Sequence, residues 1–277
     1  MIHKIDFIIG GAQKCGTSAL ARYLEQHPDI YIPDTEIHYF DILAEKYGLE
    51  WYLRQFQKGE GKVIGEKTPR YIRFPEVAQC IKKNFPDIKM IFLLRNPVDR
   101  AYSHYWHMRR QGLEIRSFDV AIRQSRVFGL LHGPDYVKRG MYVEQLRYWY
   151  DEFGRDQILV LKAENMKENA QGILDQVFAF IGVRTGVNVL TPPVHVGTVP
   201  RNAFHHVLLL PINAMKHLNN YRIYSLQRIL FRTNQFLLRF NKPGYPKMRR
   251  ETRSKLETFF APYNKELKAL TGVDWGY

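Results

Sequence analysis

Cysteine is almost absent from this chain of 277 residues, which has only Cys15 and Cys80. Two cysteines at that separation form neither a disulfide framework nor a metal-binding pattern. The sequence also lacks any apolar run long enough to cross a bilayer, so it predicts no transmembrane helix. The first residues lead directly into a strand-like segment without the apolar stretch of a secretory signal. We therefore expect a protein of a reducing, cytoplasmic compartment with no membrane insertion.

Acidic residues are scarce relative to basic ones, because 27 Asp and Glu stand against 41 Lys and Arg, for a net charge of +14. The excess is concentrated in residues 201–260, which hold twelve Lys or Arg and two Glu. A basic field favours an anionic ligand, a polyanion or a membrane surface. No zinc-finger, basic-zipper or RNP motif occurs, so nucleic acid is not an expected partner. No Asp-rich cluster occurs near the motifs described below, so we expect no metal.

Short apolar runs alternate with helical patterns along the first two thirds of the chain. The runs cover residues 5–9, 63–64, 90–94 and 158–161, and the helical patterns cover 18–26, 98–110, 143–152 and 172–181. This alternation predicts an α/β fold with an open parallel sheet flanked by helices. We expect a single domain over residues 1–277. Its basic, aromatic segment 203–245 would form a helical lid or a substrate-side insertion, a membrane-surface helix being the alternative.

A glycine-rich loop separates the first strand-like run from the first helical pattern. Residues 10–18 read Gly-Gly-Ala-Gln-Lys-Cys-Gly-Thr-Ser. Backbone N–H groups at such a helix start point at an anion, and the helix dipole favours negative charge there. The loop is P-loop-like, but Lys14 precedes Gly16 by two residues, whereas the Walker A lysine directly follows the last glycine. A P-loop kinase or NTPase that needs Mg²⁺ is therefore the weaker enzyme hypothesis.

Polar residues also follow the second and third strand-like runs. Ligands bind outside the carboxyl ends of strands in open α/β sheets, so these positions are candidates for a site. Lys67 follows the second run, and Arg95 follows the third at the start of a helical pattern. A guanidinium fork matches phosphate geometry, and Ser103, two helical turns on, adds a hydroxyl donor. The alternative is a structural pair between Arg95 and Asp99.

Glu36 and His38 are the candidate proton acceptors. They stand two residues apart, so in an extended segment both side chains face the same side. Each is a plausible general base. The alternative for each is a solvated or hydrogen-bonded structural role.

Taken together, these segments resemble PAPS-dependent sulfotransferases, particularly the heparan sulfate branch and its bacterial relatives; PAPS is 3′-phosphoadenosine 5′-phosphosulfate. The matching motifs are Gly10–Ser18, Asp34–Asp41, Glu66–Pro69 and Arg95–Ser103, in that order. The C-terminal segment Phe259–Leu267, followed by Trp275, resembles the bacterial members. The resemblance covers most of the chain except about residues 203–245.

The resemblance implies a role for each motif. Lys14 would neutralise charge on the leaving phosphate oxygen, Glu36 would take the proton of the acceptor, and Lys67 would sit near the sulfuryl group. His38 would orient the acceptor or replace Glu36 as the base. Tyr39 and Tyr71 would contact the acceptor. The cofactor-binding residues would be Gly11, Lys14, Cys15, Gly16, Thr17, Ser18, Arg95, Ser103 and Arg201.

The predicted function is in-line, metal-independent transfer of the sulfuryl group from PAPS to a hydroxyl or amine, with PAP as the product. Positioning and charge neutralisation supply most of the effect in such a transfer. The expected acceptor is a small natural-product molecule in a bacterial cell, and a glycan is the alternative. A non-enzymatic polyanion-binding module is the remaining alternative. The expected state is a monomer or homodimer.

Overall fold

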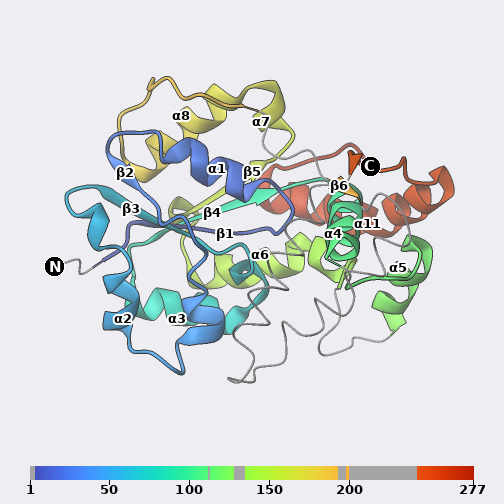
Figure 1. Ribbon diagram of the computed structural model, residues 1–277, viewed down its shortest axis with the longest axis horizontal. Helices are drawn as coiled ribbons and strands as arrows, with labels where there is room; N and C mark the ends of the chain where they lie inside the picture. Colours follow the sequence, from blue (N-terminus) through green and yellow to red (C-terminus); the bar gives the residue numbers. More distant parts are fainter. Residues whose placement is uncertain (1–3, 112, 128–134, 193–197, 200–241) are drawn as a thin grey trace. The chain divides into compact units, whose positions relative to one another are not determined.

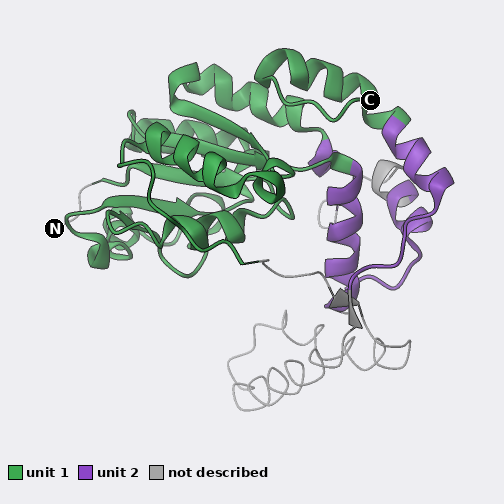
Figure 2. Ribbon diagram, turned by 90° about the horizontal axis from the view of Figure 1, so that it is seen from above, with its two compact units in different colours: residues 1–97, 141–192, 258–277 green, residues 98–140, 193–257 purple. Residues whose placement is uncertain are grey.

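The computed structural model describes residues 4–111, 113–127, 135–192, 198–199 and 242–277. The chain divides into two compact units, shown in Figure 2. The first comprises residues 1–97, 141–192 and 258–277, and the second comprises residues 98–140 and 193–257. Most of the segment predicted as a lid, and Arg201 with it, lies outside the described residues. The predicted domain boundaries stay a prediction.

The first unit contains one five-stranded sheet in which every strand is parallel to its neighbours. The strand order is β2-β3-β1-β4-β5. The strands are β1 (Phe7–Gly11), β2 (Ile30–Tyr31), β3 (Val63–Lys67), β4 (Lys89–Leu94) and β5 (Ile158–Lys162). All of β1 is buried, and so is β4 apart from Lys89, as expected for parallel strands covered on both faces. The predicted α/β class with a parallel sheet flanked by helices is confirmed.

Helices cover both faces of this sheet (Figure 1). Helices α1 (Thr17–Leu24) and α8 (Ala170–Ile181) lie on one face, and α3 (Pro75–Asn84) and α6 (Tyr142–Glu152) lie on the other. The fully buried Trp149 of α6 anchors the second layer, because its ring packs on Phe92 and its indole N–H donates to the Ile72 carbonyl at 3.1 Å. The remaining helices that reach this unit are α2 (Leu49–Arg54), α7 (Asn165–Glu168) and the end of α11 (Arg250–Thr271).

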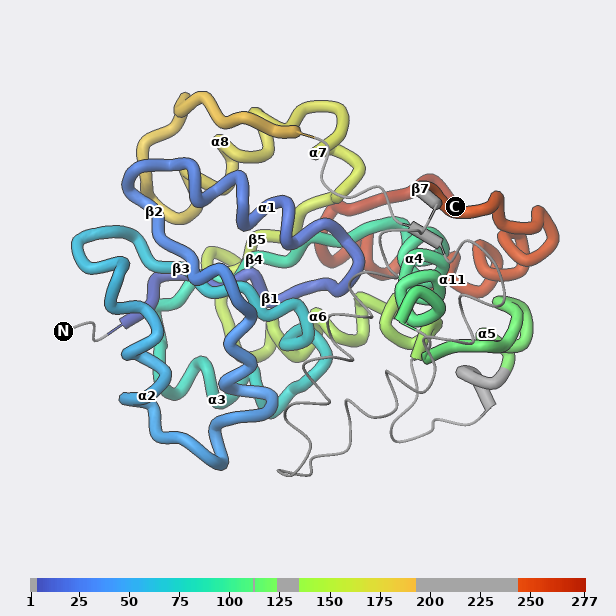
Figure 3. Tube along the Cα trace, in the orientation of Figure 1, coloured from blue at the N-terminus to red at the C-terminus, as the bar shows by residue number. Residues whose placement is uncertain are grey.

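The chain between β2 and β3 can be followed in Figure 3 through α2, which the sequence did not predict. A single π-helical turn, Tyr39–Leu43, precedes α2. Aromatic rings hold the two together: Tyr39 stacks on Tyr52 with ring centroids 4.6 Å apart, and Phe40 meets Tyr52 edge-on at 5.2 Å. This aromatic packing holds the end of the Asp34–Asp41 motif against α2.

The second unit has its own buried contacts. Among the described residues, its helices are α5 (Phe118–Val127), all but the first residue of α4 (Pro97–Arg110) and the start of α11. A short antiparallel pair joins β6 (Thr198–Val199) to β7 (Lys242–Pro243). Glu114 is buried there, where it pairs with Arg116 at 2.6 Å and accepts from the Tyr136 hydroxyl at 3.0 Å.

Candidate active site

The glycine-rich loop joins β1 to α1, and two of its glycines are required for different reasons. A Cβ on Gly11 would lie 2.7 Å from Ile72, so packing excludes a side chain there. Gly16 has φ 95°, in the left-handed region that favours glycine, and it caps α1 without a side chain. The first N–H groups of α1 therefore have no capping side chain beside them, which fits the anion site predicted at this helix start.

Two predicted nucleotide-binding segments are joined by Tyr142. Cys15 is buried in the loop with its Sγ 3.5 Å from the Tyr142 hydroxyl. The same hydroxyl donates to the backbone carbonyl of Arg95 at 2.9 Å. The loop also receives support from β4, because the Ala12 N–H donates to the Leu93 carbonyl at 2.9 Å. Arg95 and the loop are thus neighbours at the carboxyl edge of the sheet.

Two other residues were predicted to bind the 3′-phosphate. Ser103 is buried in the second unit, and Arg201 lies outside the described residues. Asp99, the alternative partner of Arg95, forms an ion pair with Arg253 inside that second unit.

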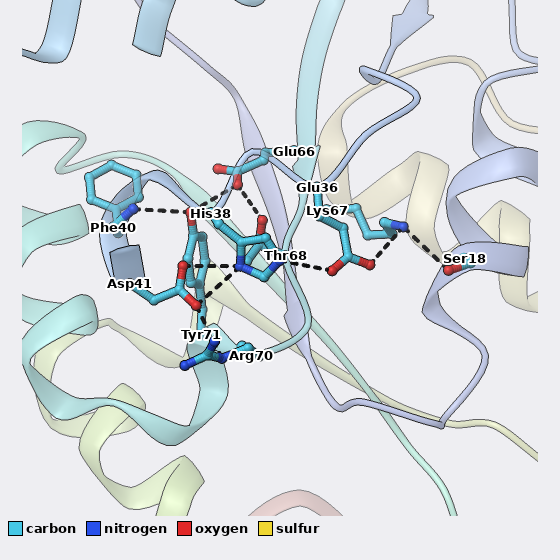
Figure 4. Close-up of polar contacts among 10 residues, drawn as sticks. All are labelled: Ser18, Glu36, His38, Phe40, Asp41, Glu66, Lys67, Thr68, Arg70 and Tyr71. Carbon is cyan, nitrogen blue, oxygen red and sulfur yellow. Dashed lines mark hydrogen bonds and ion pairs between the residues drawn. The ribbon is translucent and has the colours of Figure 1, made fainter. Parts of the chain in front are cut away.

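Three of the predicted catalytic and cofactor-binding side chains come together from separate segments (Figure 4). Lys67, at the end of β3, places its Nζ 3.0 Å from Glu36 Oε1 and 3.3 Å from the Ser18 hydroxyl of α1. The lysine therefore bridges the candidate base and the glycine-rich loop.

His38 completes the cluster through both ring nitrogens. Its Nε2 lies 3.2 Å from Glu36 Oε2, and its Nδ1 lies 3.1 Å from each oxygen of Asp41. The extended backbone assumed for this segment is wrong, because His38 has φ 55° and caps the π-helical turn. Glu36 and His38 nevertheless contact each other. The π-helical turn places Asp41 against the other ring nitrogen of His38.

The charges of this cluster distinguish the two candidate bases. Hydrogen bonds to Asp41 and Glu36 raise the pKa of His38 to about 9, so the imidazole is protonated at neutral pH and donates from both nitrogens. Burial alone would raise the pKa of Glu36, but hydrogen bonds and charge from His38 and Lys67 lower it. Glu36 is thus an ionised carboxylate at neutral pH, and the arrangement favours Glu36 over His38 as proton acceptor.

Asp41, Arg70 and Glu66 had no predicted role. Arg70 Nε lies 3.3 Å from Asp41 Oδ2, and its guanidinium covers the Phe74 ring at 5.4 Å. Asp41 is therefore held by cations on two sides. The only signal in the sequence was its position three residues after His38, which links the two only once the π-helical turn is known.

Tyr39 and Tyr71 are buried in the core, and their predicted contact with an acceptor stays a prediction. Tyr71 has no exposed surface and Tyr39 is 5% exposed. The Tyr39 hydroxyl donates to the Tyr47 carbonyl at 3.1 Å, and the Tyr71 hydroxyl bonds to Glu66. Aromatic side chains near a motif gave no means to separate lining from core, because both environments select large apolar rings.

No group of three His, Cys, Asp or Glu that could hold a metal ion occurs within the residues that the structure describes. No helix of this described part is long and apolar enough to span a bilayer.

Comparison with known protein families now adds to this geometry. The family model for the sulfotransferase domain matches residues 4–196. The chain belongs to the sulfotransferase domain family. The predicted family is confirmed, and membership supports the predicted use of PAPS.

The relatives of this sulfotransferase-family chain agree with the resemblance. Human heparan sulfate glucosamine 3-O-sulfotransferase 3B1 is 28% identical over 98% of this chain and 64% of its own length. Human heparan sulfate glucosamine 3-O-sulfotransferase 6 is 27% identical over 98% of this chain and 72% of its own length. The chain spans less than two thirds of the length of the first relatives that it matches.

A solved structure from a bacterium shares the fold. The crystal structure of a sulfotransferase from Alicyclobacillus acidocaldarius has a TM-score of 0.74 and 28% identity, and the match covers 98% of this chain and 97% of that one. A mouse sulfotransferase complexed with PAP, at 14% identity and a TM-score of 0.51, shows the fold alone.

Proposed function

We propose that this protein transfers the sulfuryl group of PAPS to a hydroxyl group, with Glu36 as the general base. The observation that carries the proposal is the position of Lys67 between Glu36 and the loop residue Ser18. A base and an anion-binding loop linked by one lysine are the two parts that an in-line transfer needs within reach of each other.

The residues of the first unit fit the cofactor. PAPS supplies the sulfuryl group attached to a phosphate that leaves as part of PAP. The start of α1 behind Gly16 would hold the 5′-phosphosulfate, with Lys14 as its charge partner. Arg95 stands beside that loop at the carboxyl edge of the sheet and would bind the 3′-phosphate. Ser103 and Arg201 stay proposed contributors to the same phosphate.

Glu36 would receive the proton of the acceptor at Oε1 or Oε2. Its ionised state at neutral pH makes it ready to accept, and the cationic His38 holds its orientation. Lys67 lies where it can turn from Glu36 toward the negative charge at the loop, since it already reaches Ser18. That movement of Lys67 would break its ion pair with the Glu36 carboxylate when the phosphosulfate occupies the loop.

We propose a carbohydrate hydroxyl as the acceptor. The relatives that align over 98% of this chain are named as glucosamine 3-O-sulfotransferases of heparan sulfate. The basic residues of the C-terminal third would attract an anionic chain. The small natural-product acceptor expected from the sequence stays a prediction that the same experiment tests.

The experiment measures transfer of ³⁵S from labelled PAPS to an N-sulfated heparosan oligosaccharide and to p-nitrophenol. We expect Glu36→Gln to lower turnover by about 10²–10⁴-fold, the contribution of a positioned base, while PAP affinity stays within a few fold of wild type. Glu50→Gln, on an exposed side chain of α2, is the matched control and should leave turnover unchanged. Full turnover in Glu36→Gln would move the base elsewhere, and labelling of p-nitrophenol alone would remove the carbohydrate acceptor.

A further inference from the structure

Tyr71 makes two hydrogen bonds that connect the core to the catalytic cluster. Its hydroxyl lies 3.2 Å from the backbone nitrogen of Phe40 and 2.9 Å from Glu66 Oε1. Tyr71 and Glu66 both have no exposed surface. Water therefore cannot replace either bond, and a lost partner would leave a buried polar group unsatisfied.

The direction of these two bonds is fixed. A backbone N–H can only donate, so the Tyr71 oxygen must accept from Phe40. The single proton of the hydroxyl is then left for Glu66 Oε1, which accepts it. This direction holds for either protonation state of Glu66, because its other oxygen, which contacts the Tyr52 hydroxyl, can carry a proton or accept one. Thr68 Oγ1 donates to the same Oε1 at 2.6 Å.

The tethered backbone lies inside the catalytic cluster. Phe40 stands between His38 and Asp41, whose side chains are 3.1 Å apart across the π-helical turn. Fixing the Phe40 N–H fixes the spacing of that turn. The other end of the tether, Glu66, directly precedes Lys67 in β3, and Lys67 contacts Glu36. The two buried hydrogen bonds of Tyr71 thus connect the His38–Asp41 turn to β3, whose Lys67 contacts Glu36 (Figure 4).

We propose that Tyr71, held by the buried Glu66, is a positioning residue that sets the His38–Asp41 turn and thereby holds His38 in register with Glu36. It touches neither cofactor nor acceptor in this role. The proposal rests on the proposed function for its turnover measurement alone, because the state of His38 can be measured without any substrate.

The test compares Tyr71→Phe with Tyr52→Phe. Both changes remove one hydroxyl from Glu66 inside the same buried cluster, but Tyr71 alone also bonds the Phe40 backbone. Three quantities are measured: the His38 pKa, the melting temperature and turnover. NMR titration gives the His38 pKa, and the His38→Gln variant assigns its signal. The charged groups in contact with His38 are Glu36 and Asp41, which raise its pKa. Glu36 also pairs with Lys67, and Asp41 also pairs with Arg70.

We expect Tyr71→Phe to lower the His38 pKa by about one unit or more, because the imidazole loses alignment with one carboxylate. Turnover should fall about 10²-fold, the loss expected when a catalytic group is misplaced by about 1 Å. PAP affinity should stay unchanged. Tyr52→Phe should lower the melting temperature comparably and leave the His38 pKa and turnover at wild-type values. Equal His38 pKa values in the two variants and the wild type would overturn the proposal, whatever the activity.

A measurement on the wild-type protein covers the case in which Tyr71→Phe does not fold. The Phe40 amide should exchange with solvent as slowly as the buried amides of β3, since its acceptor is buried. Exchange of Phe40 as fast as that of the exposed residues around Lys46 would show that the tether is not formed. Loss of turnover in Glu36→Gln with unchanged PAP affinity would support the proposed function independently of the tether.

Discussion

At the scale of single residues, the charge of His38 depends on the fold. Two carboxylates face its two nitrogens, so folding stabilises the imidazolium. The folded pKa of about 9 lies above the ordinary value of 6.5. The stabilising effect is therefore fully present below about pH 6.5 and is lost as the pH rises through about 9.

This dependence gives a prediction for stability. The difference in unfolding free energy between the wild type and His38→Gln should be largest near pH 6 and should shrink as the pH approaches 9.5. Urea denaturation of both proteins at pH 6, 7.5 and 9.5 measures it. A difference that grows with pH would contradict the assignment of a cationic His38. His27, whose ring nitrogen lies 3.0 Å from the Arg184 carbonyl, offers a control substitution, His27→Gln, away from the cluster.

The sequence predicted part of this residue-scale arrangement. Lys67 and Ser18 were expected near each other because each follows a strand at the same edge of a parallel sheet, and the structure brings them to 3.3 Å. The roles of Glu66 and Tyr71 could not be predicted. These roles depend on burial, and a Glu next to a Lys in the sequence gives no sign that it is buried.

At the scale of elements, the site depends on the registration of β1 against β3. Phe7 of β1 pairs with Gly65 of β3 in that register. A Cβ on Gly65 would overlap the Phe7 ring. The absence of a side chain at Gly65 thus lets the ring lie against the strand, and this packing sets where Glu66 and Lys67 emerge.

Gly65→Ala should destabilise the protein by about 1–3 kcal/mol through overpacking, although alanine is otherwise favoured over glycine within a strand. Gly48→Ala is the control, because Gly48 has φ −69° and a Cβ there would meet nothing within 4 Å. That change should stay within about 0.5 kcal/mol of wild type. Chemical denaturation of the three proteins measures both effects. A Gly65→Ala protein as stable as wild type would mean that β1 and β3 pair in another register.

The sequence patterns predicted most strands of the sheet and the helices α1, α4, α6 and α8, but they missed α3, α5 and the 22-residue α11. Continuous apolar runs marked β1, β4 and β5 because a parallel strand is buried on both faces. The two residues of β2 are too few to show any period. The π-helical turn was missed because it depends on the left-handed backbone at His38, which no local pattern announced.

At the scale of the whole molecule, the net charge of +14 agrees with anionic ligands but does not choose among them. The parallel sheet of one unit carries the proposed site for the sulfuryl donor, while Ser103 belongs to the other unit. The basic segment 203–245, expected to form a lid, lies for the most part outside the described residues, so its part in acceptor binding stays a prediction. Composition alone identified that segment as unusual.

The most direct test of the central claim is a titration of the purified protein with PAP in EDTA, followed by thermal stability, with AMP and Mg-ATP as comparisons. A ligand that binds only the folded state adds about 2.7 kcal/mol at a hundred times its dissociation constant. The account predicts a large shift with PAP, a small one with AMP, and loss of this preference in Arg95→Ala. No shift with PAP, together with a shift with Mg-ATP, would contradict the sulfotransferase mechanism proposed here.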